Sequence, residues 1–273
     1  MNWRAIRAIV RKDLKVVSQS RAVVLPMVLV PVVLLVIIPA VVGFAALNVD
    51  INDPQLSDLT VMLEQMPAGL LNEFEPLPSD SARLFVYTVV YAFAPLFLIL
   101  PLMVANVIAA DSFVGEKERK TLEALIYTPT TDQELYVAKL LSPWLAALAT
   151  TAIGLLVYTL VVNIIGWPAL GRVFFPNLTW IALAVWVAPA AAGLGLGAMV
   201  LVSSRVNTFQ EAYQLGSIVV LPVVAVLIGQ FAGFITFDLG FALAMGLVLW
   251  LVDAAILWYG VRGFQRVSLL AQL

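Results

Sequence analysis

The sequence predicts an all-α integral membrane protein with six transmembrane helices. Of its 273 residues, 62% are apolar and only 12% are charged, whereas a soluble domain carries about 25% charged residues. Six apolar stretches each reach the roughly 20 residues that a helix needs to cross a bilayer. Within them apolar residues run on without the polar alternation of a membrane β-barrel strand. We therefore expect a single transmembrane domain over residues 1–273.

The six predicted spans cover most of the chain. They are Ala22–Leu47, Leu84–Ala110, Ser142–Ile165, Leu178–Val202, Tyr213–Phe234 and Leu239–Val261. Only Ile235–Asp238 separates the last two, which leaves room for a tight hairpin. The first two spans contain prolines, which remove a backbone donor and kink a helix; these are Pro26, Pro31, Pro39, Pro95 and Pro101.

Basic residues predict the orientation of the spans. Thirteen of the 15 lysines and arginines lie before the first span, after the second, after the fourth or after the sixth, and only Arg83 and Arg172 lie on the opposite side. By the positive-inside rule both termini are cytoplasmic. We expect a multi-pass protein of the inner or plasma membrane, in contact with the lipid bilayer.

Two residue types that are absent from the sequence limit the kinds of catalytic and metal site that the protein can form. The sequence has no cysteine and no histidine, which excludes disulfides, imidazole bases and His- or Cys-based metal sites. A net charge of −2 is too small to suggest nucleic acid as a partner. An intramembrane hydrolase would need a Ser–Lys or paired-aspartate arrangement, but no predicted span contains lysine and Asp253 has no second aspartate in a span. We expect no metal site and no catalytic site.

Residues 1–21 form an amphipathic helix by their spacing. Apolar residues recur every three or four positions from Trp3 to Val17, and arginines and Lys15 mark the other face. A basic face with an aromatic anchor suits the cytoplasmic membrane surface. The segment is either a basic flank that happens to be helical or an interfacial helix that also contacts a partner. In the outer loop, residues 48–83, apolar residues at helical spacing predict one or two short extracellular helices.

The cytoplasmic segment 111–141 predicts an elbow of two helices. Asp111 or Ser112 is placed to cap a charged helix, Thr128-Pro129 ends it, and Thr131 with Glu134 forms a capping box that starts the next helix. Apolar side chains at 122, 125 and 126 give the charged helix a stripe suited to docking; the alternative is an ordinary solvated loop. The turn 203–211 has a similar pattern, with a second capping box at Thr208 and Glu211 that begins the fifth span. Phe209 would then be an exposed aromatic residue. The alternative is a simple turn between two spans.

The run Gly115–Leu125, followed by Thr128-Pro129, Glu134-Leu135 and Lys139-Leu140, resembles the cytoplasmic signature of type 2 ABC transporter permeases. These are the membrane subunits of ATP-binding-cassette exporters, and the resemblance covers essentially the whole chain. It implies a second permease copy or paralogue and a separate ABC ATPase nucleotide-binding subunit that holds ATP and Mg. It also implies that the charged helix is the coupling helix. The residues expected to couple to the ATPase are Gly115, Glu116, Lys117, Glu118, Arg119, Lys120, Thr121, Leu122, Glu123, Arg205 and Phe209. The outer loop is longer than in polysaccharide exporters, so their substrates are not assumed.

The expected function is therefore a permease that moves a substrate outward. No Gly-x-x-x-x-Gly-Lys-Ser/Thr run occurs in the sequence, so we expect no enzyme activity and no cofactor in this chain. The alternative is an ion-coupled secondary transporter or channel, which would depend on Asp253, the one acid well inside a span. Asp253 and Asn106 are the candidates for substrate binding. Small residues at Gly193, Gly195 and Gly197 allow the close helix approach that pairing with a second copy would use; the alternative is that they make this span flexible.

Overall fold

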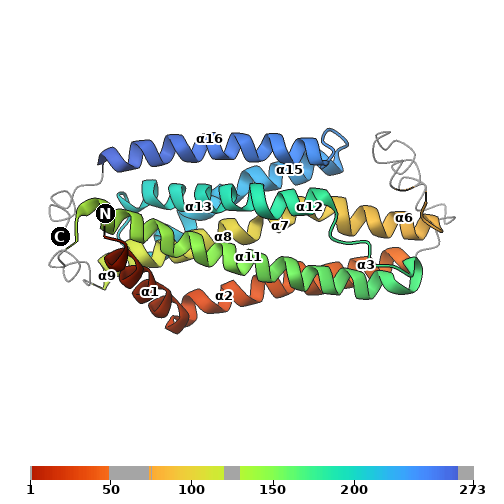
Figure 1. The fold of residues 1–273 in the computed structure, drawn as a ribbon, viewed down its shortest axis with the longest axis horizontal. Coiled ribbons are helices and arrows are strands. Elements are labelled where there is room, and N and C mark those ends of the chain that lie inside the picture. The colour runs from red at the N-terminus through yellow and green to blue at the C-terminus, as the bar shows by residue number, and fades with distance from the viewer. Residues whose placement is uncertain (1, 49–73, 75, 120–129, 264–273) are drawn as a thin grey trace.

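A computed structural model of the chain describes residues 2–48, 74, 76–119 and 130–263. All regular structure in these ranges is helical. Six helical segments are long and apolar enough to cross a membrane, and they lie along a common direction (Figure 1). The segments are Val23–Asn48, Asp80–Glu118, Asp132–Leu170, Leu178–Ser203, Phe209–Phe231 and Leu239–Trp258. The predicted fold class is confirmed.

The N-terminal helix α1 (Trp3–Gln19) lies obliquely to the spans (Figure 1). The Asn2 side chain caps it by accepting hydrogen bonds from the backbone N–H groups of Arg4 and Ala5. Ser20 is extended, which turns the chain into the first span. That span consists of α2 (Arg21–Val32), a wider π-helical turn η1 (Val33–Ile37) and α3 (Ile38–Asn48). The predicted amphipathic helix is thus present; its buried face packs on the protein.

The second span lies at the centre of the bundle, with 83% of its most apolar window buried. It consists of α6 (Asp80–Val86), the π-helical η3 (Tyr87–Ala92), α7 (Ala94–Phe97), α8 (Ile99–Ala110), the π-helical η4 (Asp111–Gly115) and α9 (Glu116–Glu118). The prediction that Asp111 or Ser112 caps a new helix was wrong. Asp111 pairs with Arg119 further along the same segment, Ser112 contacts Lys139 of the third span and Asp13 of α1, and the helix continues through both residues in a wider turn.

The third span is the helix α11 (Asp132–Leu170), which begins at the predicted Thr131–Glu134 capping box and ends at Gly171 with a φ of 61°. Its 39 residues extend about 58 Å at the rise of an α-helix. Because the hydrocarbon core of a bilayer is about 30 Å thick, the ends of α11 project beyond it. The apolar stretch predicted as the span is the middle of this longer helix.

The remaining spans complete the bundle. The fourth contains α12 (Leu178–Ala182), η5 (Leu183–Val187) and α13 (Ala188–Ser203); the fifth contains α14 (Phe209–Gly216), the 3-10 turn η6 (Ser217–Val220) and α15 (Leu221–Phe231); the sixth is α16 (Leu239–Gly263). The short link between α15 and α16 contains Gly233 with a φ of 76°, as the predicted hairpin requires.

Glycines of α13 serve packing within this chain. A Cβ added at Gly195 would lie 2.7 Å from the carbonyl oxygen of Leu102 in α8, and one at Gly197 would lie 2.8 Å from the side chain of Ile256 in α16. Gly193 of α13 faces the carboxylate of Asp253, which like Ile256 belongs to α16. The expectation that these glycines meet a second copy is therefore corrected, because other helices of the same chain occupy that space.

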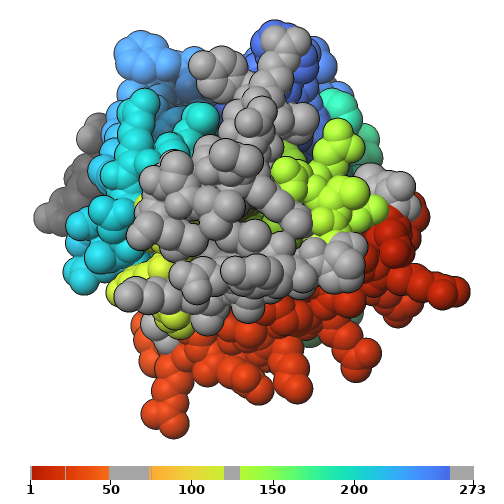
Figure 2. All heavy atoms as spheres, turned by 90° about the vertical axis from the view of Figure 1, so that its left-hand side faces the viewer, coloured from red at the N-terminus to blue at the C-terminus, as the bar shows by residue number. Residues whose placement is uncertain are grey.

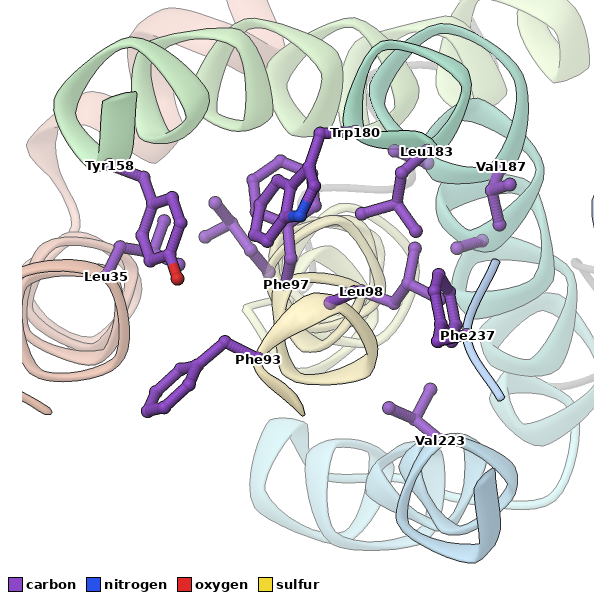
Figure 3. Close-up of a cluster of buried hydrophobic side chains, with 14 of the residues drawn as sticks. Leu35, Phe93, Phe97, Leu98, Tyr158, Trp180, Leu183, Val187, Val223 and Phe237 are labelled. Atoms are coloured by element: carbon purple, nitrogen blue, oxygen red, sulfur yellow. The ribbon is translucent and has the colours of Figure 1, made fainter. Parts of the chain in front are cut away.

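An aromatic cluster holds the π-helical turn η3 of the second span (Figure 3). Tyr158 and Trp180 stack with ring centroids 4.7 Å apart and an interplanar angle of 12°. The Tyr158 hydroxyl donates to the Val89 carbonyl at 2.5 Å, and the Trp180 indole donates to the Val90 carbonyl at 2.6 Å. Side chains of the third and fourth spans thus stabilise the wide turn of the second.

The short helices expected in the outer loop lie outside the described residues, since 49–73 and 75 are not among them. So do Lys120, Thr121, Leu122 and Glu123 of the expected coupling helix, together with its proposed end at Thr128-Pro129.

Candidate functional site: the charged end of the bundle

Charged and polar side chains gather where α9 ends the second span, at the end of the bundle that also holds the start of α1 and of α11 (Figure 1). Figure 2 looks onto this end and shows the N-terminal helices along one edge. The site arises because the apolar run of α8 gives way to Asp111, Ser112 and Glu116 while the helix is still packed inside the protein. All three side chains are buried.

Glu116 bridges two lysines from other helices. Its Oε2 lies 2.6 Å from Lys139 Nζ of α11, and its Oε1 lies 2.5 Å from Lys12 Nζ of α1. Glu116 is 5% exposed and Lys139 is 2% exposed. A buried charge is costly unless it is paired and hydrogen-bonded, so this carboxylate requires α1 and α11 to stay against the end of the second span.

Further hydrogen bonds complete the partners of Lys139 and Asp13. The Lys139 ammonium also donates to the Ser112 carbonyl at 2.7 Å and to the Ser112 hydroxyl at 3.2 Å. Asp13 Oδ2 accepts from the hydroxyls of Ser112 at 3.4 Å and Ser142 at 3.3 Å. Asp13 Oδ1 lies 3.2 Å from Lys12 Nζ. Two lysines and two carboxylates from three helices therefore balance in charge.

Burial lowers the pKa of the Lys12 ammonium, but hydrogen bonding and charge attraction to Glu116, together with the charge of Asp13, outweigh burial and raise this pKa above its ordinary value. Lys12 is therefore charged at neutral pH. The Lys12–Glu116 contact is then a full ion pair that tethers α1 to the second span.

A second contact fixes the start of α1 to the start of α11. The backbone N–H of Asn2 donates to Glu134 Oε1 at 2.5 Å, while Glu134 Oε2 accepts from Thr131 in the capping box. Ile6 and Ile9 form an apolar cluster with Leu135 and Ala138 of α11. The apolar face of the N-terminal helix thus lies on the third span.

The two loops expected to face a partner meet at this end. The backbone N–H of Phe209 donates to Glu118 Oε2 at 2.8 Å, and Lys117 Nζ donates to the Val206 carbonyl at 3.4 Å. Arg119 pairs with Asp111 at 2.9 Å. Glu118, Arg119 and Arg205 are exposed. The end of the second span and the turn between the fourth and fifth spans therefore form one surface.

Three of the residues that we expected to couple to an ATPase are less exposed than that role predicts. Glu116 was expected to face an ATPase, but it is buried among lysines of its own chain. Gly115 is buried too, because a Cβ there would lie 2.9 Å from Asp111 Oδ1. Phe209, expected as an exposed aromatic, is half-buried and stacks on Tyr213 with centroids 6.3 Å apart. Thr208 caps α14 as predicted, although Glu211 bonds the N–H of Asn207 rather than that of Thr208.

The two substrate-binding candidates lie apart along α13. Asp253 is 3% exposed and faces Gly193. Asn106 is 2% exposed and lies beside Met199 and Gly216, as shown by the close approach of both residues to the Gly216 backbone. Both Asp253 carboxylate oxygens and Asn106 Oδ1 have no hydrogen-bond partner among the described residues. The structure does not join them in one site.

Sequence reasoning missed Asp13, Lys12 and Lys139 as a cluster. One signal was available for Asp13: it lies three residues after Val10 and four before Val17, on the apolar face of an otherwise basic helix. An acid at such a position needs a buried partner. Nothing in the local sequence identified Glu116 and Lys139, 23 residues apart, as that partnership.

A bundle of six helices that are long and apolar enough to span a membrane, with a charged end held by buried ion pairs, defines a multi-pass membrane protein. The chain matches the family model described as ABC-2 family transporter protein over residues 7–257. It belongs to this family, and is an ABC transporter permease. Chains of this family are normally the non-enzymatic membrane subunits of their transporters. Neither the search of curated proteins nor that of solved structures gave a match.

Proposed function

We propose that this permease is the membrane subunit of an ATP-driven exporter and that the surface formed by Glu118, Arg119 and Arg205 docks a separate nucleotide-binding subunit. The observation that carries the proposal is the Glu118–Phe209 contact. It makes the two cytoplasmic segments one surface, so that a single partner would touch both. ATP and Mg would bind to that partner.

The buried ion pairs supply a route from this surface to the spans. Lys117 and Glu118 are the two residues that follow Glu116, whose side chain is paired with Lys12 of α1 and Lys139 of α11. A push on the surface would therefore move the end of the second span together with the first and third. Contiguous networks of packed and ion-paired side chains of this kind carry energetic coupling between distant sites.

The proposal includes the arrangement in the cell. The charged end faces the cytoplasm of an inner or plasma membrane by the distribution of lysine and arginine. Two permease chains, identical or paralogous, enclose the pathway, and the substrate leaves outward.

A photocrosslinking amino acid at Arg119 tests the docking surface. In whole cells, a crosslinker replacing Arg119 should capture an ATP-binding subunit identified by mass spectrometry. The same crosslinker at Arg172, an exposed residue beyond the other end of α11, is the matched control and should not. Capture of no ATP-binding subunit at 119, or equal capture at both positions, would refute the docking proposal.

Charge reversal adds a quantitative test. At the proposed interface, Glu118→Lys combined with Leu122→Ala would place like charges together and take away an apolar side chain, and mispaired charges at an interface cost several kcal/mol. We expect normal membrane insertion with loss of ATPase association. Normal binding and stimulation of the ATPase by this double variant would show that the segment is not the coupling helix.

The unpartnered carboxylate of Asp253 favours a second candidate, an ion-coupled carrier, since buried acids in spans often serve as ion relays. The two functions differ in energy source. Transport that stops on depletion of ATP with an intact proton gradient, and that survives Asp253→Asn, supports the exporter. Transport that follows the gradient and stops in Asp253→Asn supports the carrier.

A further inference from the structure

An apolar groove of about 470 Å³ opens between α1, the first span and α11. This volume falls within the roughly 300–1,000 Å³ of ligand pockets. One face of each of three segments lines it, within residues 14–18 of α1, 24–36 of the first span and 146–157 of α11; Leu29 and Leu156 are not part of this lining. In Figure 1, α1 and α2 form the two arms of an elbow, and α11 lies above α2.

The side chains at the bottom of the groove are buried, and those along its walls are exposed. Gly154 forms the floor because it lets α11 approach the first span; a Cβ there would lie 2.9 Å from Leu35. Leu35 is 3% exposed, whereas the wall residues Val28 and Ile153 are 57% and 62% exposed. The groove is therefore accessible from the lipid side of the bundle.

The lining is apolar along its whole length. Its two hydroxyls are satisfied within their own helices, since Ser18 donates to the Lys15 carbonyl and Thr150 to the Ala146 carbonyl. Residues 24–36 extend about 18 Å at the rise of a helix, close to the roughly 15 Å depth of one leaflet. The groove thus has the chemistry and the length of one acyl chain.

A basic stripe runs along α1 from the groove-lining segment 14–18 toward the N-terminus. Arg7, Arg11 and Lys15 follow at intervals of four residues, which places them on one side of α1. All three are exposed. The acid of this helix, Asp13, is buried against Lys12 and the serines, so it does not neutralise the stripe. An anionic group above the groove would meet several positive charges.

We propose that this groove binds one acyl chain of an anionic phospholipid from the leaflet nearer α1, with its headgroup on Arg7, Arg11 and Lys15. The lipid fills the space between α1 and the first span. It thereby supports the position of α1, the helix that carries Lys12 to Glu116.

Native mass spectrometry of the purified permease tests this proposal, with phosphatidylglycerol and phosphatidylcholine as probes. Ile153→Trp fills the groove, while Leu156→Trp, on the same helix but outside the lining, is the matched control. We expect Ile153→Trp to weaken phosphatidylglycerol binding about tenfold, because each methylene excluded from an apolar site weakens binding by a constant factor. Leu156→Trp should bind like the unmodified protein.

The headgroup is tested separately. Arg7→Gln, Arg11→Gln and Lys15→Gln together should abolish the preference for phosphatidylglycerol over phosphatidylcholine. Val28→Trp, with Leu29→Trp as its control, repeats the groove test from the other wall if Ile153→Trp does not fold. Unchanged lipid binding in a folded groove variant, or no preference for the anionic lipid in the unmodified protein, would overturn the proposal. The proposal would also be overturned if the groove variants lost a permease dimer while their lipid binding stayed constant, because a second copy of the chain would then be what covers the groove.

Discussion

Glu116 Oε2 and Lys139 Nζ lie 2.6 Å apart inside the protein and join the end of the second span to the start of the third. Lys12 of α1 reaches the other oxygen of the same carboxylate. Three segments distant in sequence therefore depend on one side chain. The acid expected to touch a partner instead holds the surface that would touch it.

Removal of Glu116 should destabilise the fold. Glu116→Ala leaves the Lys139 ammonium buried without its carboxylate, and breaking a buried pair costs about 3–5 kcal/mol. Thermal unfolding in detergent measures the loss. Glu118→Ala is the adjacent control and should cost about 1 kcal/mol at most, since its one bond is exposed. Equal losses for the two variants would contradict the assignment of Glu116 as the central brace.

Replacing Glu116 and Lys139 together should cost less stability than the sum of the two single replacements. Glu116→Gln with Lys139→Met removes both charges together, so the double variant should be more stable than Lys139→Met alone, which leaves the buried carboxylate with Lys12 as its remaining cation. A double-mutant cycle on the unfolding free energy checks this. Additive losses would mean that the two residues do not interact.

Gln230 should support the wide turn of the second span. Pro95 has no N–H to donate to the Tyr91 carbonyl, and the Gln230 amide donates to that carbonyl at 2.8 Å. Gln230→Leu removes this hydrogen bond, which costs about 1 kcal/mol, and should speed amide hydrogen exchange in η3. Gln214→Leu, at an exposed position of α14, should leave both quantities unchanged; a similar effect there would indicate a nonspecific change.

Gly193 should tolerate no side chain while Asp253 faces it. A Cβ at Gly193 would overlap Asp253 Oδ2, so Gly193→Ala should lower the unfolding free energy by about 1–3 kcal/mol. Asp253→Ala in the same chain should restore much of this loss. Gly240→Ala, where the nearest atom would lie at 3.7 Å, is the control. Failure of the second substitution to rescue Gly193→Ala would show that the clash lies elsewhere.

Thiol labelling should report the orientation of the bundle. The natural sequence has no cysteine, so a single Arg172→Cys or Arg119→Cys provides the only thiol. An impermeant reagent applied to intact cells should label position 172, and should label position 119 only after the membrane is opened. Labelling of position 119 from outside would reverse the proposed topology.

Several local features were predictable because they depend on neighbouring residues. The Thr131–Glu134 capping box formed because both partners lie within one helical turn. The interruption near Pro95 follows from the missing N–H of that residue alone. Asp111 and Ser112 resembled a helix cap for the same local reason. They lost that role because the helix continues through them: Asp111 pairs with Arg119 further along the same segment, and Ser112 contacts Lys139, which only the packed structure brings within reach.

The sequence by itself determined that the chain crosses the membrane six times, since span length and hydrophobicity are properties of consecutive residues in a solvent that has no hydrogen bonds to offer. It also determined the amphipathic helix before the first span, since helical spacing is local. Only the tertiary structure decided which charges are buried together. Glu116, Lys12 and Lys139 lie on three segments, and a buried charge takes whichever opposite charge the packing of the helices places within a few ångströms. That distance depends on how whole helices cross, which no short stretch of sequence specifies.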